Sequence, residues 1–291
     1  MKLVALGLGY SAAAFVAQGA GRFSHVTATV RQPERALALS RPGLDVIPWA
    51  GGPPPVALAG ALREADALLV SVPAGEGGDP ALPWLASDIA AAPGLRWIGY
   101  LSTVGVYGDH AGAVVTESSA LRATSQRGLD RIAAEAAWLR LGESAGKAVQ
   151  IFRLAGIYGP GRNQLAALRE GAARRIVKPG HLFSRIHVDD IAGACLTSLD
   201  RPRPGAAYNV ADDEPAPASE VVTFAAALLG VTPPPEENFE TAALSPMARS
   251  FYADSRKVSN ARLTGELGYA LRYPTYREGL RALLIAGEGG A

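Results

Sequence analysis

The chain has 291 residues, of which 48% are hydrophobic and 19% are charged, and its formal net charge is +1. This composition predicts a globular protein with a sizeable core and excludes a disordered chain. Because neither sign of charge dominates, we expect no nucleic-acid partner and no membrane-surface partner.

The sequence also indicates where the protein is located and whether a disulfide or a metal site is expected. No apolar stretch reaches the ~18 residues that a transmembrane helix needs, and the first predicted strand begins at Lys2, which leaves no room for a signal peptide. We therefore expect a cytoplasmic protein. The single cysteine, Cys195, excludes an internal disulfide, and its apolar neighbours predict a buried side chain. The four histidines show no metal-ligand spacing, so no metal site is predicted.

Strand-like and helix-like segments alternate through the first half of the chain. Short apolar runs predict strands at residues 2–6, 25–30, 44–48, 67–72, 96–101 and 149–154. Helices are predicted between them at residues 12–18, 33–40, 56–62, 84–92 and 126–141. This alternation predicts an α/β fold: a doubly wound parallel sheet of the Rossmann type, with helices on both faces.

The second half is less regular and contains proline-rich connections. Helices are predicted at residues 188–199, 219–229 and 276–285. We expect a smaller mixed α/β C-terminal lobe that covers the ends of the sheet. The larger lobe would contain residues 1–160 and about 182–211, and the smaller lobe would contain about 161–181 and 212–291.

A glycine-rich motif follows the first predicted strand. Gly7-Leu8-Gly9-Tyr10-Ser11-Ala12 fits G-x-G-x-x-A and opens a helix, which is the context of a dinucleotide-binding turn. Gly7 would permit the tight turn, Gly9 would let a pyrophosphate approach the backbone, and Ala12 would let helix and strand pack closely. The helix start, with Tyr10 and Ser11, would supply free N–H groups to the phosphates. The alternative is an ordinary turn.

The end of the second predicted strand indicates which cofactor is bound. An acidic residue there binds the ribose 2′-hydroxyl of NAD, whereas an arginine accommodates the 2′-phosphate of NADP. The strand is followed by Arg31 and Arg35, with no acidic residue at its end. These arginines favour NADP(H) over NAD(H), unless both are solvated surface residues or Glu34 turns inward.

Four further stretches resemble the extended short-chain dehydrogenase/reductase family, of the NAD-dependent epimerase/dehydratase type. They read LSTVGVYG at 101–108, RLAGIYGPG at 153–161, IHVDDIA at 186–192 and YNVADD at 208–213. The resemblance implies that Thr103, with Ser102 as its neighbour, binds the substrate oxygen. It is compatible with a homodimer, although no residue indicates one.

The chain departs from this family at the catalytic helix. The family carries Tyr-x-x-x-Lys followed four residues later by Glu, and alignment on Glu135 puts Arg127 at the tyrosine and Arg131 at the lysine. Arginine stays charged and cannot shuttle a proton. Arg131 could hold a ribose or phosphate, and Arg127 could clamp an anionic substrate group. The alternative is a surface pair of Arg131 with Glu135 and a solvated Arg127.

Another residue would then have to supply the proton. Tyr107 is the candidate because it follows Thr103, although its counterpart in related proteins more often packs near the cofactor. Packing is also expected for Tyr158, and a structural role for His187. Asp189 and Asp190 are expected to cap the following helix and charge its first turn.

The leading hypothesis is an NADP(H)-dependent oxidoreductase or epimerase-like enzyme that acts on an unidentified small metabolite. Its competitor is a dinucleotide-binding regulator or scaffold without turnover. A basic cluster of Arg174, Arg175 and Lys178 could also meet an anionic substrate, or could form a solvated face.

Overall fold

A seven-stranded parallel sheet forms the centre of the protein. The computed structural model describes residues 1–288. The strand order is β11-β7-β5-β4-β1-β2-β3, and every neighbouring pair is parallel, which confirms the predicted doubly wound sheet. The strands are β1 (Lys2–Leu6), β2 (His25–Val30), β3 (Leu44–Pro48), β4 (Ala67–Val70), β5 (Trp97–Thr103), β7 (Ala148–Leu154) and β11 (Ala207–Val210).

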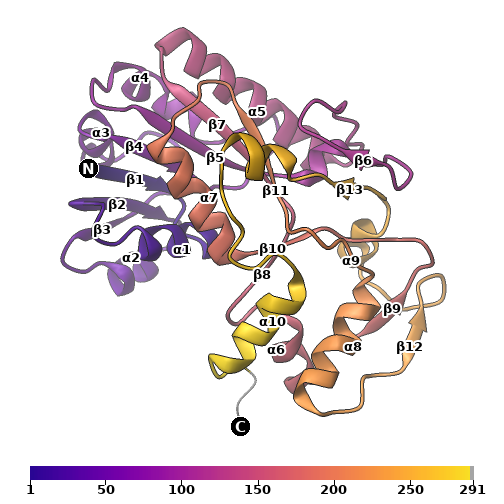
Figure 1. Cartoon of the computed structure of the whole chain (residues 1–291). Helices are drawn as coiled ribbons and strands as arrows, with labels where there is room; N and C mark the ends of the chain where they lie inside the picture. The colour runs from indigo at the N-terminus through magenta and orange to yellow at the C-terminus, as the bar shows by residue number, and fades with distance from the viewer. Residues whose placement is uncertain (289–291) are drawn as a thin grey trace.

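Helices cover both faces of the sheet (Figure 1). One face packs against α1 (Tyr10–Gln18), α2 (Pro33–Leu39) and α7 (Val188–Asp200), and the other against α3 (Val56–Arg63), α4 (Leu82–Ala91) and α5 (Gln126–Ala145). The two apolar cores therefore lie on opposite sides of the strands. This explains why the strand sequences are continuously apolar rather than alternating.

Several helix ends follow directly from the sequence. Pro33 occupies the first turn of α2, where its missing N–H costs nothing. The Ser125 side chain caps α5 by accepting a hydrogen bond from the N–H of Gly128, and Gly146 ends α5 in the left-handed conformation, with φ of 65°. Local chemistry thus fixes the helix that carries Arg127 and Arg131.

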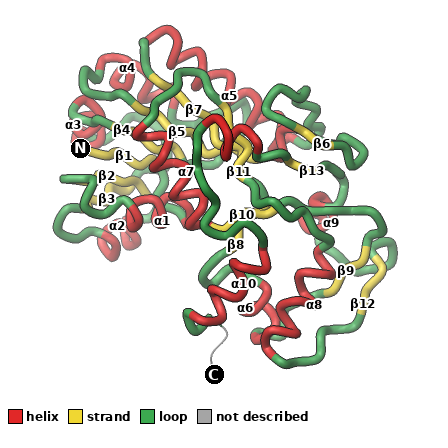
Figure 2. The backbone as a smooth tube through the Cα atoms, viewed as in Figure 1, coloured by secondary structure: helices red, strands yellow, loops and turns green. Residues whose placement is uncertain are grey.

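Most of the remaining elements form a second group next to the sheet (Figures 1 and 2). Side chains of α6, α8 and α10 share a separate apolar core. We propose these elements as the smaller lobe, with the boundaries given above: α6 (Gln164–Arg169), β9 (Arg175–Val177), α8 (Ala218–Leu229), β12 (Glu236–Asn238), α9 (Pro246–Phe251) and α10 (Tyr276–Ile285). A parallel pair, β8 (Gly156–Tyr158) and β10 (Arg185–His187), lies between this group and the sheet.

The structure adds elements that the sequence patterns did not predict. The seventh sheet strand, β11, has four residues, and α6, α9, β8, β9, β10 and β12 are similarly short. The predicted burial of Cys195 is confirmed. Within residues 1–288, no helix combines the length and the apolar character needed to cross a bilayer.

Candidate active site

The glycine-rich turn has the geometry that its motif predicts. Gly7 has a φ of +88°, and its N–H donates to Oγ1 of Thr29 (2.9 Å). A β-carbon at Gly7 would lie 3.1 Å from the backbone nitrogen of Val72, so a side chain there would be strained both by this contact and by the positive φ. Gly9 precedes α1, and a β-carbon on it would meet no described atom within 4 Å. The first helical turn leaves N–H groups without intrahelical partners, and the space beside Gly9 is open, so these residues fit a pyrophosphate.

A cavity of about 870 Å³ lies at the carboxyl ends of the strands. Its wall on the sheet side includes Ser11 from α1, Ser71 after β4, and Thr103 at the end of β5. Residues of α6, α8 and α10 form the opposite wall. The cavity thus adjoins the glycine-rich turn and separates the sheet from the smaller lobe, as binding sites at the switch point of such sheets do.

Ser102 and Thr103 both line this cavity but differ in what their hydroxyls can do. Ser102 is buried, and its hydroxyl donates to Oε1 of Glu135 at 2.5 Å. Thr103 Oγ1 accepts a hydrogen bond from the N–H of Gly105 (3.0 Å), which leaves its own proton available. Thr103 therefore has a hydrogen bond to give to a substrate oxygen, and Ser102 does not.

Arg131 is fixed against the end of β5. Its Nη1 donates to the hydroxyl of Tyr100 and to the carbonyl of Leu101, both at 2.9 Å, and its guanidinium lies 5.6 Å from the Tyr100 ring. Burial raises the pKa of Tyr100 to about 12, so the phenol stays neutral. Arg131 therefore presents a fixed positive charge on the cavity wall.

The alternative of a surface pair between Arg131 and Glu135 is wrong. Glu135 is only 3% exposed and faces the other way, toward Arg153 of β7 at 2.8 Å. Arg127 also lines the cavity; it is exposed, and its side chain makes no hydrogen bond or ion pair with any residue from 1 to 288. An unpaired guanidinium on a cavity wall is suited to an anionic group.

Tyr107 is packed inside the protein and does not line the cavity. Its side chain is fully buried; its hydroxyl donates to Oδ1 of Asn209 (2.6 Å) and accepts from Nη1 of Arg153 (2.9 Å). Burial raises the pKa of this phenol. The structure thus does not bring Tyr107 to the cavity, and we do not assign it the proton transfer.

His187 and Tyr158 pack edge to face, with ring centres 5.1 Å apart. His187 Nδ1 accepts the N–H of Asp189 (3.1 Å), so His187 caps α7; the prediction that Asp189 or Asp190 is the cap is corrected. Burial lowers the pKa of His187 to about 4, which keeps the ring neutral. Both aspartates lie in the first turn of α7, as predicted.

The arginines after β2 lie beside the glycine-rich turn. Arg31 and Arg35 are exposed, and Nη2 of Arg35 is 3.4 Å from the carbonyl oxygen of Leu8. Glu34 is exposed as well. This position suits the adenosine end of a dinucleotide.

The basic cluster of the smaller lobe is neither free nor at the cavity. Arg174 pairs with Glu237 (2.5 Å) and Arg175 with Glu236 (2.5 Å), so both arginines join β9 to β12. Lys178 donates to the carbonyl of Tyr252 (2.5 Å). None of the three residues lines the cavity, so the structure does not support a substrate-binding patch; the two ion pairs lie at the protein surface, as the solvated-face alternative expects.

Sequence patterns missed three further arginines on the cavity wall: Arg162, Arg185 and Arg256. Arg162 directly follows one recognised stretch and Arg185 directly precedes another, but neither stretch indicates a cavity. Arg185 lies at the start of β10, and Nη1 donates to the carbonyls of Phe183 (2.8 Å) and Ala216 (2.9 Å). Their convergence depends on tertiary folding, so no local signal could have found it.

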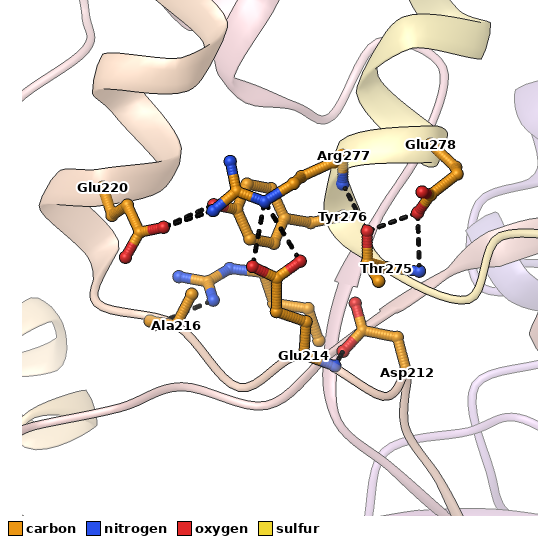
Figure 3. A network of polar contacts seen from close by, with 9 residues as sticks. Asp212, Glu214, Ala216, Glu220, Thr275, Tyr276, Arg277 and Glu278 are labelled. Atoms are coloured by element: carbon orange, nitrogen blue, oxygen red, sulfur yellow. Dashed lines mark hydrogen bonds and ion pairs between the residues drawn. The ribbon is translucent and has the colours of Figure 1, made fainter.

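A polar network holds the cavity wall formed by α8 and α10 (Figure 3). Arg277 of α10 donates to Glu214 (2.9 Å) and pairs with Glu220 of α8. Thr275 and Glu278 form a capping box at the start of α10. These contacts keep the apolar side chains of α8 and α10 in place against the cavity.

The arrangement defines an α/β protein with a glycine-rich turn at the carboxyl end of β1, inside a parallel sheet. Residues 86–211 match the model of the NAD dependent epimerase/dehydratase family. Protein YeeZ of Escherichia coli (strain K12) is 31% identical over 225 residues, which cover 74% of each chain. The chain belongs to this family.

Solved structures agree on the fold. A functionally unknown conserved protein from Silicibacter pomeroyi DSS superposes with a TM-score of 0.87, at 43% identity and 99% coverage of both chains. The dTDP-glucose 4,6-dehydratase of Bacillus anthracis str. Ames, solved in complex with NAD, has a TM-score of 0.79 at 18% identity and covers 100% of this chain and 97% of its own. At that identity, the likeness concerns the fold alone.

Proposed function

We propose that this protein is an NAD(P)-dependent oxidoreductase or epimerase-like enzyme that acts on a small anionic metabolite. The observation that carries the proposal is the cavity itself, which Ser11 of the glycine-rich turn lines together with Thr103 and Arg127. Family membership supports a nicotinamide dinucleotide, and the Bacillus anthracis relative of the same fold holds NAD.

The cofactor-binding residues divide into three groups. The N–H groups of Gly9, Tyr10 and Ser11 would face the pyrophosphate, with Gly7 shaping the turn and Ala12 packing the helix on β1. Arg31 and Arg35 would hold the 2′-phosphate of NADP(H), which we propose as the preferred cofactor. Arg131 would contact the ribose on the nicotinamide side. The bound nicotinamide would supply or accept a hydride.

The remaining residues act on the substrate. Thr103 donates its free hydroxyl proton to the substrate oxygen in a hydrogen bond, and Ser102 fixes the backbone of this strand end through Glu135. Arg127 binds an anionic group and so sets which carbon faces the nicotinamide. Arg127 and Arg131 stabilise negative charge that develops on oxygen, but neither can deliver the proton.

A dinucleotide-binding regulator without turnover is the second candidate. It is favoured by the two arginines, Arg127 and Arg131, at the positions where the resemblance implies a proton-transfer pair, and by the bonding of Tyr107 to Asn209. Turnover decides between the two. An enzyme should oxidise NADPH in the presence of a carbonyl compound with an acidic group, and Arg127→Ala should slow this reaction more than Arg140→Ala, a change at an exposed arginine on the same helix.

Isothermal titration of the purified protein with NADPH and with NADH tests the proposal, after a check for cofactor carried through purification. We expect NADPH to bind at least about tenfold more tightly, because two arginines are available to its extra phosphate. Binding of neither dinucleotide would refute both candidates.

A further inference from the structure

Arg162 lies in a rigid turn between β8 and α6. The N–H of Gly159 donates to the carbonyl of Arg162, and the N–H of Arg162 donates to the carbonyl of Gly159, both at 3.0 Å. Asn163 braces the turn by donating from Nδ2 to the Gly159 carbonyl (2.9 Å), and its Oδ1 caps α6. The backbone that carries Arg162 is therefore fixed.

This turn lies against the start of α1. The hydroxyl of Tyr10, the first residue of α1, donates to the carbonyl of Pro160 at 2.9 Å. A β-carbon on Gly159 would lie 2.6 Å from the same hydroxyl oxygen, so glycine allows this approach. Burial raises the pKa of Tyr10, and the charge of Arg162 partly opposes that rise. Arg162 is therefore near the glycine-rich turn.

The guanidinium of Arg162 is also uncommitted. It is exposed and lines the same cavity as Ser11, and it forms no hydrogen bond or ion pair with another residue in the described part of the chain. The nearby carboxylates have other partners, since Glu288 accepts from the N–H of Gly161 (2.7 Å) and Asp189 pairs with Arg272 (3.3 Å). A cation without a partner in residues 1–288 thus lines the same cavity as the start of α1, whose positive end also favours an anion.

We propose that Arg162 binds the pyrophosphate of the dinucleotide from the side opposite to the N–H groups of α1. The inference rests on the proposed function and assigns a cofactor-binding role to a residue outside the sheet. A guanidinium can donate two parallel hydrogen bonds to phosphate oxygens. The cofactor would then be held between α1 and the 159–163 turn. The hydrogen bond from Tyr10 to Pro160 would hold this turn in a fixed position relative to α1.

Isothermal titration with three probes tests this role: NADPH, ADP-ribose, and adenosine 2′,5′-bisphosphate, which lacks a pyrophosphate. Arg162→Ala should weaken ADP-ribose and NADPH by about tenfold and leave the bisphosphate unchanged. Arg162→Lys should recover part of the loss, because lysine keeps the charge but not the fork. Arg169→Ala, at an exposed arginine in the last turn of α6, is the matched control and should bind all three as the unaltered protein does.

The outcomes are separable. Unaltered ADP-ribose affinity in Arg162→Ala would overturn the inference, as would an equal loss for all three probes. The inference would also be overturned if Arg162→Ala kept its affinity for all three probes but, when loaded with NADPH, lost the ability to bind inorganic phosphate. Arg162 would then belong to a site for an anionic substrate. If the unaltered protein bound no ADP-ribose and no NADPH, the proposed function would itself have failed.

Discussion

At the residue scale, Arg31 is the side chain that should distinguish the two nicotinamide cofactors. It is exposed at the end of β2, beside the glycine-rich turn, where the 2′-phosphate of NADPH would lie. Arg31→Ala should weaken NADPH binding by about tenfold or more and NADH binding by less than about threefold, because only NADPH carries the phosphate. Arg140→Ala serves as the control. Equal effects on both dinucleotides in calorimetry would remove the cofactor assignment.

His187 should make folding sensitive to acid. Its pKa is about 4 in the folded protein, below the usual 6.5, because the ring is buried and Nδ1 accepts a backbone N–H. Between these values the unfolded chain binds more protons, so the protein loses stability as pH falls from about 6.5 to 4. The loss is at most about 3 kcal/mol.

His187→Asn separates this contribution from other acid effects. Asparagine can also cap a helix but does not titrate. Urea denaturation should therefore show the unaltered protein losing stability relative to the variant between pH 7 and pH 4.5. A difference between the two proteins that does not change with pH would show that His187 does not titrate as described.

At the element scale, a buried ion pair joins α5 to the sheet. Glu135 of α5 accepts hydrogen bonds from Arg153 of β7 and from Ser102 of β5, and Arg153 also donates to Tyr107. The network fixes the strand end that presents Thr103 to the cavity. Its loss should affect both stability and the shape of the site.

Arg153→Met should cost about 3–5 kcal/mol of unfolding free energy, because Glu135 would stay buried without its partner. Arg174→Met removes the more exposed Arg174–Glu237 pair and should cost less than about 1 kcal/mol. Urea denaturation of both variants measures the contrast. Similar costs would mean that the buried pair contributes little beyond a surface pair.

Some features could be predicted from the sequence and others could not. Strand β1, the glycine-rich turn and α1 were predictable, because each depends on residues that are neighbours along the chain. The Arg131–Glu135 pair was not, because four-residue spacing cannot reveal that Glu135 turns toward Arg153, a residue from another strand. Tyr107 likewise looked available until folding brought Asn209 and Arg153 to its hydroxyl. The short strand β11 carried too few apolar residues to be recognised.

At the scale of the whole molecule, the site depends on two groups of elements meeting. The sheet supplies the glycine-rich turn and Thr103, β10 supplies Arg185, and the proposed smaller lobe supplies the apolar wall of α8 and α10. The pair β8 and β10 and the bond from Tyr10 to Pro160 connect them. The fold and the geometry of the glycine-rich turn could therefore be predicted from the sequence, whereas the residues that line the rest of the cavity required the structure.

The central claim is that a dinucleotide lies against the glycine-rich turn, and calorimetric titration of Gly9→Val with NADPH tests it most directly. Gly9 has an ordinary φ of −89°, and a β-carbon there would meet no described atom within 4 Å, so the change should cost the fold only about 1 kcal/mol. We predict that the variant melts close to the unaltered protein yet binds NADPH at least about a hundredfold more weakly, because the side chain would occupy the place of the pyrophosphate. A folded Gly9→Val variant that binds NADPH as tightly as the unaltered protein would contradict the account.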